Sequence, residues 1–373
     1  NRKGIYFMKI YCDRDKLNDA IQVVSKAVAR KSNLASIEGI LLVAENETLT
    51  LTGYDFELGI KTTFDCRIEE DGDIVLSSRL LGNIVKKVSD DEIYISADDK
   101  MNCVIQCGNA RYNIKGIDST DYPDLPSANS DNCVKIEKSL FSQMCDYVSY
   151  AVATDDKRPA HTGVLINLED MHLTMVALDG YRLAVCERAV DFEGEFKMVI
   201  PKKAMDEVRR LCVDDGKIVV YPAKRFVVFQ VDEFTIISRL LEGDFLDYRK
   251  AIPEKFMTDV IVKTRDLSDA IERVSLIITE RLRNPVRITL NQGVMSIRCS
   301  TELGEVYDEL NVNQIGPDLE IGFNNRYVLD ALRRSKKDEL IFKFSGPLAP
   351  CKIIPKEGDD FTYLVLPVRF KND

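Results

Sequence analysis

Three stretches of the chain open with the same pattern of apolar and polar positions. A short apolar–polar alternation precedes apolar residues spaced as on one face of a helix, and from residues 8, 133 and 259 the stretches read "MKIYCDRDKLNDAIQVVSKAV", "CVKIEKSLFSQMCDYVSYAV" and "DVIVKTRDLSDAIERVSLII". The alternation predicts a strand, and the 3.6-residue spacing predicts an amphipathic helix. Further alternating segments, separated by loop signals such as Glu45-Asn46-Glu47, follow each opening. Each third of the chain is therefore expected to start with a strand and a helix and to continue as a meander.

The same order recurs in the second half of each third. "GDIVLSSRLLGNIVKKV" begins at Gly72, and its equivalents begin at Lys197 and Leu319. Joins that contain Pro and Ser, at 121–131 and 247–259, mark the boundaries. We expect three tandem domains, at 8–127, 128–254 and 255–373, each of two strand-helix-meander units. Because one helix covers only part of a sheet, the two units should pack through their helices, which gives an α+β fold.

The composition bears on the cellular location of the protein and on its cysteine and metal chemistry. No apolar run approaches the roughly 18 to 20 residues that span a bilayer, and the start shows no basic segment with an apolar stretch and a cleavage site. We expect a cytoplasmic protein, and we leave "NRKGIYF" before Met8, which is either a native extension or an addition, out of the fold reasoning. The ten cysteines form no C-x-x-C pair, and with only His161 and His172 beside them nothing resembles a zinc site. We expect buried thiols, no metal and no cofactor.

The distribution of charge changes the interpretation of this acidic chain. A net charge of −10 by itself argues against nucleic acid. However, the second helix of each third carries a basic pair, and the first residues of the pairs are separated by 123 and 124 residues, which is the domain period. The pairs are Lys86-Lys87, Arg209-Arg210 and Arg333-Arg334. On the first of these helices an apolar stripe lies opposite the basic residues and contains Leu80, Leu81, Ile84, Val85 and Val88.

A solvated face is the ordinary interpretation of basic residues on any one helix. Recurrence at the domain period favours instead a basic face that meets phosphates without reading bases. The candidate residues for this nucleic-acid contact are Arg30, Lys31, Arg79, Lys86, Lys87, Lys202, Lys203, Arg209, Arg210, Arg326, Arg333 and Arg334.

One segment, "VALDGYRLAV" at 176–185, sets polar residues between two apolar runs. Asp179 could be a catalytic acid, but no plausible Ser, Cys or His partner lies nearby in the sequence, and a turn residue that bonds its own backbone beside Gly180 is the better interpretation. Tyr181 and Arg182 could be a surface pair packed across two strands. The sequence also lacks G-x-x-x-x-G-K-[ST] and G-x-S-x-G, so we expect no enzyme activity.

Several segments together resemble the bacterial β sliding clamp family, the beta subunit of DNA polymerase III, along residues 8 to 370. They are "TLTGYD", "ALDGYRLAV", "GDFLDYRKAIP", "IGFNNRYVLDAL" and "YLVLPVRF". The resemblance implies a DNA clamp (processivity) fold, in which the three domains form a six-domain ring as a head-to-tail homodimer around duplex DNA. It implies a non-catalytic subunit that binds a second copy of itself, the clamp loader, DNA polymerases and repair proteins with short clamp-binding motifs. A purely structural scaffold is the alternative, and the recurring basic pairs distinguish the two.

The resemblance also implies two protein-binding sites. A hydrophobic peptide pocket between domains 2 and 3 would contain His161, Leu178, Gly180, Tyr181, Arg182, Leu183, Leu246, Asn324, Tyr327, Leu348, Leu366, Pro367, Val368 and Arg369. Leu178 and Tyr181 stand where the family commonly has threonine and histidine, and His161 stands where an apolar residue often lies, which affects the preferred peptide. His161 could equally be a neutral, hydrogen-bonded wall residue. The dimer joint would include Tyr112 at the end of domain 1, and Ile277 and Ile278 on the first helix of domain 3.

Overall fold

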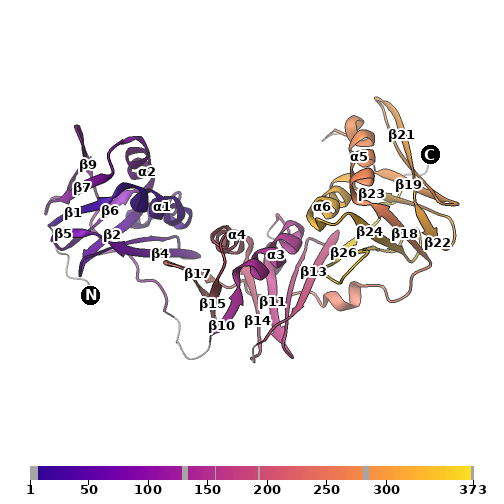
Figure 1. Cartoon of the computed structure of the whole chain (residues 1–373), viewed down its shortest axis with the longest axis horizontal. Helices are drawn as coiled ribbons and strands as arrows, with labels where there is room; N and C mark the ends of the chain where they lie inside the picture. Colours follow the sequence, from indigo (N-terminus) through magenta and orange to yellow (C-terminus); the bar gives the residue numbers. More distant parts are fainter. Residues whose placement is uncertain (1–6, 128–132, 156, 192–193, 280–284, 371–373) are drawn as a thin grey trace. The chain divides into compact units, whose positions relative to one another are not determined.

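The computed structural model describes residues 7–127, 133–155, 157–191, 194–279 and 285–370. Within these residues the chain passes six times through a strand, a helix and a meander of three strands, as the repeats predict (Figure 1). Two short additional strands, β5 (Arg67–Glu70) and β22 (Asn313–Ile315), follow the first meander of the first and third repeats. The loops also contain short 3₁₀ turns. They are η1 (Ser25–Ala27), η2 (Ala35–Glu38), η3 (Ser149–Ala151), η4 (Pro159–Thr162), η5 (Tyr248–Ala251) and η6 (Ser275–Ile277).

The first of two compact units comprises Asn1–Phe141 and Lys203–Leu240. Its five-stranded sheet has the order β5, β1 (Met8–Asp13), β7 (Glu92–Ala97), β8 (Asn102–Cys107) and β9 (Ala110–Lys115). Its eight-stranded sheet has the order β10 (Val134–Glu137), β15 (Lys217–Pro222), β16 (Phe226–Val231), β17 (Phe234–Arg239), β4 (Leu58–Asp65), β3 (Thr48–Tyr54), β2 (Gly39–Glu45) and β6 (Gly72–Ser77). The antiparallel pairing of β17 with β4 joins strands of the predicted first and second domains in one sheet.

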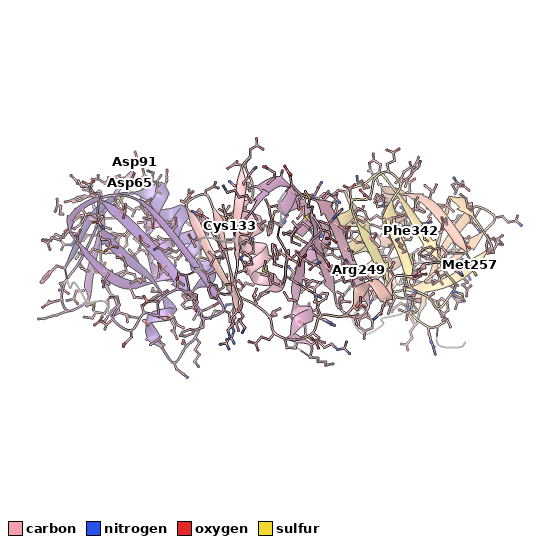
Figure 2. The ribbon with its side chains drawn as sticks, turned by 90° about the horizontal axis from the view of Figure 1, so that it is seen from below. Asp65, Asp91, Cys133, Arg249, Met257 and Phe342 are labelled. Carbon is pink, nitrogen blue, oxygen red and sulfur yellow. The ribbon has the colours of Figure 1, made fainter. Side chains whose placement is uncertain are left out.

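The second unit comprises Ser142–Lys202 and Leu241–Asp373. Its nine-stranded sheet has the order β14 (Phe196–Pro201), β11 (Gly163–Glu169), β12 (His172–Leu178), β13 (Arg182–Ala189), β26 (Thr362–Val365), β25 (Cys351–Pro355), β24 (Glu339–Phe344), β18 (Thr258–Lys263) and β22. Its four-stranded sheet has the order β21 (Gly304–Asn311), β20 (Val294–Thr301), β19 (Val286–Asn291) and β23 (Leu319–Phe323). Two side chains of this unit illustrate the range of burial, since Phe342 on β24 is 1% exposed and Met257 is 59% exposed (Figure 2).

The helices bury the stripes that the 3.6-residue period predicts. Helix α1 (Arg14–Val24) packs on α2 (Ser78–Lys87), and α5 (Thr264–Val274) packs on α6 (Asn325–Ser335). The stripes of α1 and α5 occupy equivalent positions and consist of Leu17, Ala20, Ile21 and Val24 and of Leu267, Ala270, Ile271 and Val274. The predicted stripe on α2 was wrong in one residue, because Leu80 is 42% exposed. It lies one residue, or about 100° of rotation, before the buried Leu81.

The two units cut through the predicted second domain, because its two halves extend two different sheets. Helices α3 (Lys138–Val148) and α4 (Lys202–Leu211) each have residues in both units. Contacts therefore divide the chain differently from the sequence repeats, and the predicted boundaries at 127/128 and 254/255 stay predictions.

Candidate functional site

The turn between β12 and β13 is built by Asp179, as the sequence predicts. Its carboxylate oxygen Oδ1 accepts hydrogen bonds from the backbone N–H groups of Tyr181 at 2.9 Å and Arg182 at 3.0 Å. Gly180 between them has φ of +88°, a left-handed conformation that a glycine adopts without steric cost. Asp179 is therefore a turn residue of the kind that Asp and Asn commonly form.

The guanidinium of Arg182 is held by two carboxylates rather than by solvent at a rim. Its Nε lies 2.9 Å from Asp179 and its Nη1 lies 2.5 Å from Asp330 on α6, and the side chain is 12% exposed. Burial lowers the pKa of Arg182, but the hydrogen bond that Arg182 donates to Asp330 and the charges of both carboxylates outweigh it, and the net pKa is raised. Arg182 stays charged and fastens the β12–β13 turn to α6 within the second unit.

Aromatic rings surround this ion-pair network. The rings of Tyr181 and Tyr327 are stacked at 5.9 Å between centroids and 19° between planes. The Arg182 guanidinium carbon lies 4.9 Å from the centre of the Tyr327 ring and 5.3 Å from that of Tyr150. Burial is the main reason that the pKa of Tyr150 is raised, so its hydroxyl stays neutral. The stack leaves Tyr181 61% exposed and places a broad aromatic surface next to the turn.

The C-terminal segment completes one side of this surface. The backbone N–H of Leu366 donates to the carbonyl oxygen of Tyr181 at 2.9 Å, and that of Val368 donates to Gly322 at 2.8 Å. The segment after β26 is thus fixed to the turn at one residue and to β23 two residues later. Residues two apart in an extended segment point to the same side, and the side chains of Leu366 and Val368 are 37% and 39% exposed.

The predicted pocket residues fall into three environments. Those with exposed apolar side chains are Tyr181, Leu246, Leu348, Leu366 and Val368. Leu178 and Leu183 are instead part of a buried core cluster that includes Val176 and Leu364, with the half-buried Leu241 and Phe245 packed against it. Exposed apolar groups next to an apolar core are typical of a protein-binding surface.

Other predicted pocket residues contribute to the structure around the surface. Asn324 caps α6, because its side-chain oxygen accepts the N–H of Arg326 at 3.0 Å. His161 is 6% exposed and lies edge-on to Phe245 with centroids 5.7 Å apart. Burial, followed by the charge of Arg158, lowers the pKa of His161, which agrees with a neutral wall residue. Pro367 is half-buried and Arg369 is exposed.

Leu246 lies on a separate feature of the second unit. It lines a groove of about 600 Å³ together with Asn167, Glu195 and Arg249. No other predicted pocket residue lines this groove.

Sequence reasoning missed the residues that anchor Arg182. Asp330 follows Tyr327 by three positions on α6 and therefore shares its face, a signal that the 3.6-residue period could have supplied. Tyr150 lies in the turn after α3 and shows no comparable signal.

The basic pairs lie in the last turns of α2, α4 and α6. All the candidate DNA-binding residues are exposed except Lys202 and Arg209, which are half-buried. Several already have partners: Lys203 pairs with Asp55 at 2.7 Å, Arg210 with Glu207 at 2.6 Å and Arg333 with Glu272 at 2.9 Å, and Lys202 and Arg209 also have interaction partners. Across the described part of the chain no ion pair involves Lys86 or Lys87, which leaves their charges available.

One predicted joint residue lies on the edge strand of a sheet, and the other two lie in and after a turn. Tyr112 is half-buried on β9, the last strand of the five-stranded sheet. The placement of Ile277 and Ile278 on a helix was wrong, because α5 ends at Val274, Ile277 lies in the turn η6 and Ile278 follows it. Serine side chains explain the early end, since Ser275 bonds back to the carbonyl of Ile271 at 2.6 Å.

The described residues contain no group of His, Cys, Asp and Glu side chains that could hold a metal ion, and no helix long and apolar enough to cross a membrane. Eight of the cysteines are buried, Cys66 is half-buried, and Cys133 is exposed, so the expectation of buried thiols was wrong for Cys133.

Comparisons with known proteins place this fold in one class. Family models of the DNA polymerase III beta subunit match at residues 8–126 (N-terminal domain), 135–247 (central domain) and 249–369 (C-terminal domain). The fold is thus the three-domain fold of a polymerase beta subunit.

The relatives specify the class further. A beta sliding clamp from Staphylococcus epidermidis is 32% identical over 95% of this chain and 96% of its own length. The structure is also similar to the DNA polymerase sliding clamp of Bacillus subtilis (TM-score 0.94, 28% identity, 98% and 100% of the two chains) and to a Pseudomonas aeruginosa clamp bound to griselimycin (0.92, 27%, 99% and 100%). The chain belongs to the beta sliding clamp family.

Proposed function

We propose that this chain acts as a ring that encloses duplex DNA and tethers replication and repair proteins to it. The observation that carries the proposal is the basic pair in the last turn of α2, α4 and α6, since in a chain of net charge −10 it recurs once in each third. Cations at helix C-termini also interact favourably with the helix dipole. That effect accounts for a cation in one helix but not for a pair at the same place in all three. Basic residues that attract the DNA phosphates without contacting the bases would allow a protein to slide along DNA of any sequence.

The ring would be a homodimer joined head to tail. Two sheet edges support this, because β9 ends the five-stranded sheet of one unit and β21 ends the four-stranded sheet of the other. Apolar residues are exposed beside the second edge, with Leu276 at 82% and Tyr307 at 50%. Unpaired edges with apolar neighbours readily associate with another chain. A joint between the edges through Tyr112, Ile277 and Ile278 would cover both.

Partner proteins would dock at the aromatic and aliphatic surface around Tyr181 and Leu366. Tyr181, Leu366 and Val368 expose apolar side chains there, and the polar groups of Arg182 are already satisfied by Asp179 and Asp330. A surface of this composition suits the Leu and Phe side chains of a short peptide. The partners would be the clamp loader, DNA polymerases and repair proteins, and the chain would itself carry no catalytic role. We place it in the cytoplasm, where replication takes place in bacteria.

The test is retention on DNA of different topology. The protein is loaded onto nicked circular DNA with a clamp loader and ATP, and half of the sample is cut once with a restriction enzyme. A threaded ring stays on the circle through gel filtration and slides off the linear form. Equal retention on both forms would show direct adhesion instead and would refute the ring.

A further inference from the structure

The turn between β3 and β4 in the first unit has the same construction as the Asp179 turn in the second. The Oδ1 atom of Asp55 accepts the N–H groups of Glu57 at 3.0 Å and Leu58 at 2.7 Å. Its own N–H donates to the carbonyl of Leu58 at 3.1 Å, as that of Asp179 does to Arg182 at 3.2 Å. The second residue of each turn has positive φ, with Phe56 at +69°. The two turns are therefore built alike.

The strands next to the two turns also correspond, β17 beside the Asp55 turn and β26 beside the Asp179 turn. Leu58 pairs with Ser238 of β17, as Arg182 pairs with Val365 of β26. The N–H of Arg239 then donates to Glu57 at 2.8 Å, which corresponds to the bond from Leu366 to Tyr181. The turn and the end of β17 thus form the same backbone frame as the proposed peptide surface.

The side chains on this second frame are different. Phe56 stands where the other turn has Gly180, and it is 50% exposed. Positive φ is strained for a bulky residue, and such strain is tolerated where the surrounding structure fixes the backbone. The Phe56 ring lies 5.4 Å from that of Tyr54, and Arg239 stands at the position of Leu366. The frame presents aromatic rings next to positive charge.

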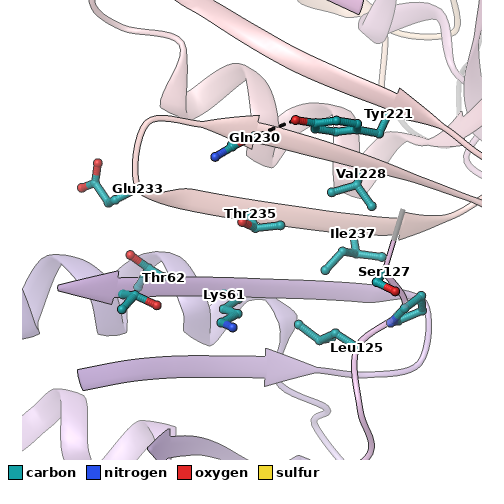
Figure 3. A pocket seen from close by; sticks show the side chains of 12 residues that line it. Lys61, Thr62, Leu125, Ser127, Tyr221, Val228, Gln230, Glu233, Thr235 and Ile237 are labelled. Carbon is teal, nitrogen blue, oxygen red and sulfur yellow. Dashed lines mark hydrogen bonds between the residues drawn. The ribbon is translucent and has the colours of Figure 1, made fainter. Parts of the chain in front are cut away.

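These residues line a cavity of about 330 Å³ that also includes Arg225, Pro126 and Ile237. Pro126 and Ile237 line a second cavity of about 530 Å³, which reaches Lys61 and Thr235. Figure 3 shows Lys61 and Thr235 on the two strands that meet there, with Leu125 on the segment at one end. The two cavities form one groove along β17, hereafter the β17 groove. A six-residue strand is about 20 Å long, so the groove suits an extended segment of similar length.

The charged residues that line the groove indicate which side chains a bound segment would have. Arg225 and Arg239 line the aromatic end of the groove, and Glu57 is the acidic residue of its lining. Arg225 is exposed, and among the described residues no carboxylate lies within ion-pair distance of it. A guanidinium binds a carboxylate in a bidentate manner and also packs on aromatic rings.

We infer that the β17 groove is a second docking site, which binds an extended acidic segment of a partner protein with an aromatic residue next to a carboxylate. The aromatic side chain packs on Phe56 and Tyr54, and the carboxylate pairs with Arg225. The site goes beyond the proposed function and does not depend on the surface around Leu366.

The experiment measures fluorescence anisotropy of two labelled peptides on the full chain. The probe is Gly-Glu-Phe-Glu-Phe-Gly, and its control is Gly-Gln-Phe-Gln-Phe-Gly. The variants are Arg225→Glu and Phe56→Gly in the groove, with Lys224→Glu as the matched charge control and Leu366→Asp as the control for the other surface. Phe56→Gly relieves the positive φ, so it removes the ring without harm to the turn.

The acidic peptide should bind more tightly than its Gln control, and Arg225→Glu should weaken it about tenfold. Phe56→Gly should weaken it several-fold, while Lys224→Glu and Leu366→Asp leave it unchanged. Three results overturn the site: equal binding of the two peptides at millimolar concentration, equal losses in Arg225→Glu and Lys224→Glu, or a loss in Leu366→Asp alone. Retention on circular DNA is measured in the same variants, so a failure of the groove is distinguishable from a failure of the ring.

Discussion

Replacing Leu366 with Asp should abolish most of the binding of a short hydrophobic peptide such as Gln-Leu-Ser-Leu-Phe. Leu366 is 37% exposed, and its backbone is fixed by the bond to Tyr181. Covering roughly 60 Å² of this side chain at about 25 cal/mol per Å² contributes about 1.5 kcal/mol. A carboxylate in its place also places an unpaired charge against the apolar insert. The combined loss is about 2 kcal/mol or more, which corresponds to a Kd weakened about thirtyfold.

Isothermal titration calorimetry with this peptide measures the effect. Met171→Asp is the matched control, because Met171 is also an exposed apolar residue of the second unit but lies at the opposite end of β12 from the Asp179 turn. Its Kd should equal that of the parent. Sedimentation of each variant checks that the mass is unchanged. If Leu366→Asp binds the peptide as tightly as the parent does, the surface around Tyr181 is not the peptide site.

The other predictions follow from the ion pairs and sheet edges. Arg182→Ala should destabilise the protein by about 1 to 2 kcal/mol in urea unfolding, because it leaves the carboxylate of Asp179, which is 14% exposed, without its guanidinium partner; an unchanged free energy of unfolding would mean that the pair is solvated. Reversing Lys86 and Lys87 to Glu should weaken DNA binding at low salt and reduce the salt slope by about 2, with an unchanged Tm, and an unchanged slope would exclude both from the DNA face. Ile278→Asp should convert a dimer to a monomer at micromolar concentration in sedimentation, and an unaltered mass would place the joint elsewhere.

The repeated pattern and the local turns could be predicted from sequence alone. Helices α1 and α5 bury the same four positions because the apolar period of each helix is encoded in its own residues. The Asp179 turn was predicted for the same reason, since a carboxylate that bonds the next two N–H groups needs only its neighbours. The exposure of Lys86 and Lys87 followed from their place opposite the stripe.

The limits of sequence reasoning appear where side chains meet over long separations. Arg182 and Asp330 are 148 residues apart, and their ion pair depends on the packing of α6 next to β13 and β26. Leu178 and Leu183 have the composition of a binding surface, yet their neighbours Val176 and Leu364 bury them in the core. The helical placement of Ile277 failed because a single hydroxyl, that of Ser275, caps the carbonyl of Ile271 and ends the helix early.

The sequence therefore determined the six units, their helices and strands, and the Asp179 turn, because these depend on periodicity and on bonds between near neighbours. Tertiary structure decided which sheets the units share, since β17 and β4 lie far apart in the sequence and pair only in the folded chain. It also decided the chemistry of the two similar frames. Tyr181 faces Tyr327 on one, while Phe56 lies beside Tyr54 and near Arg225 on the other, because residues distant in sequence surround each turn.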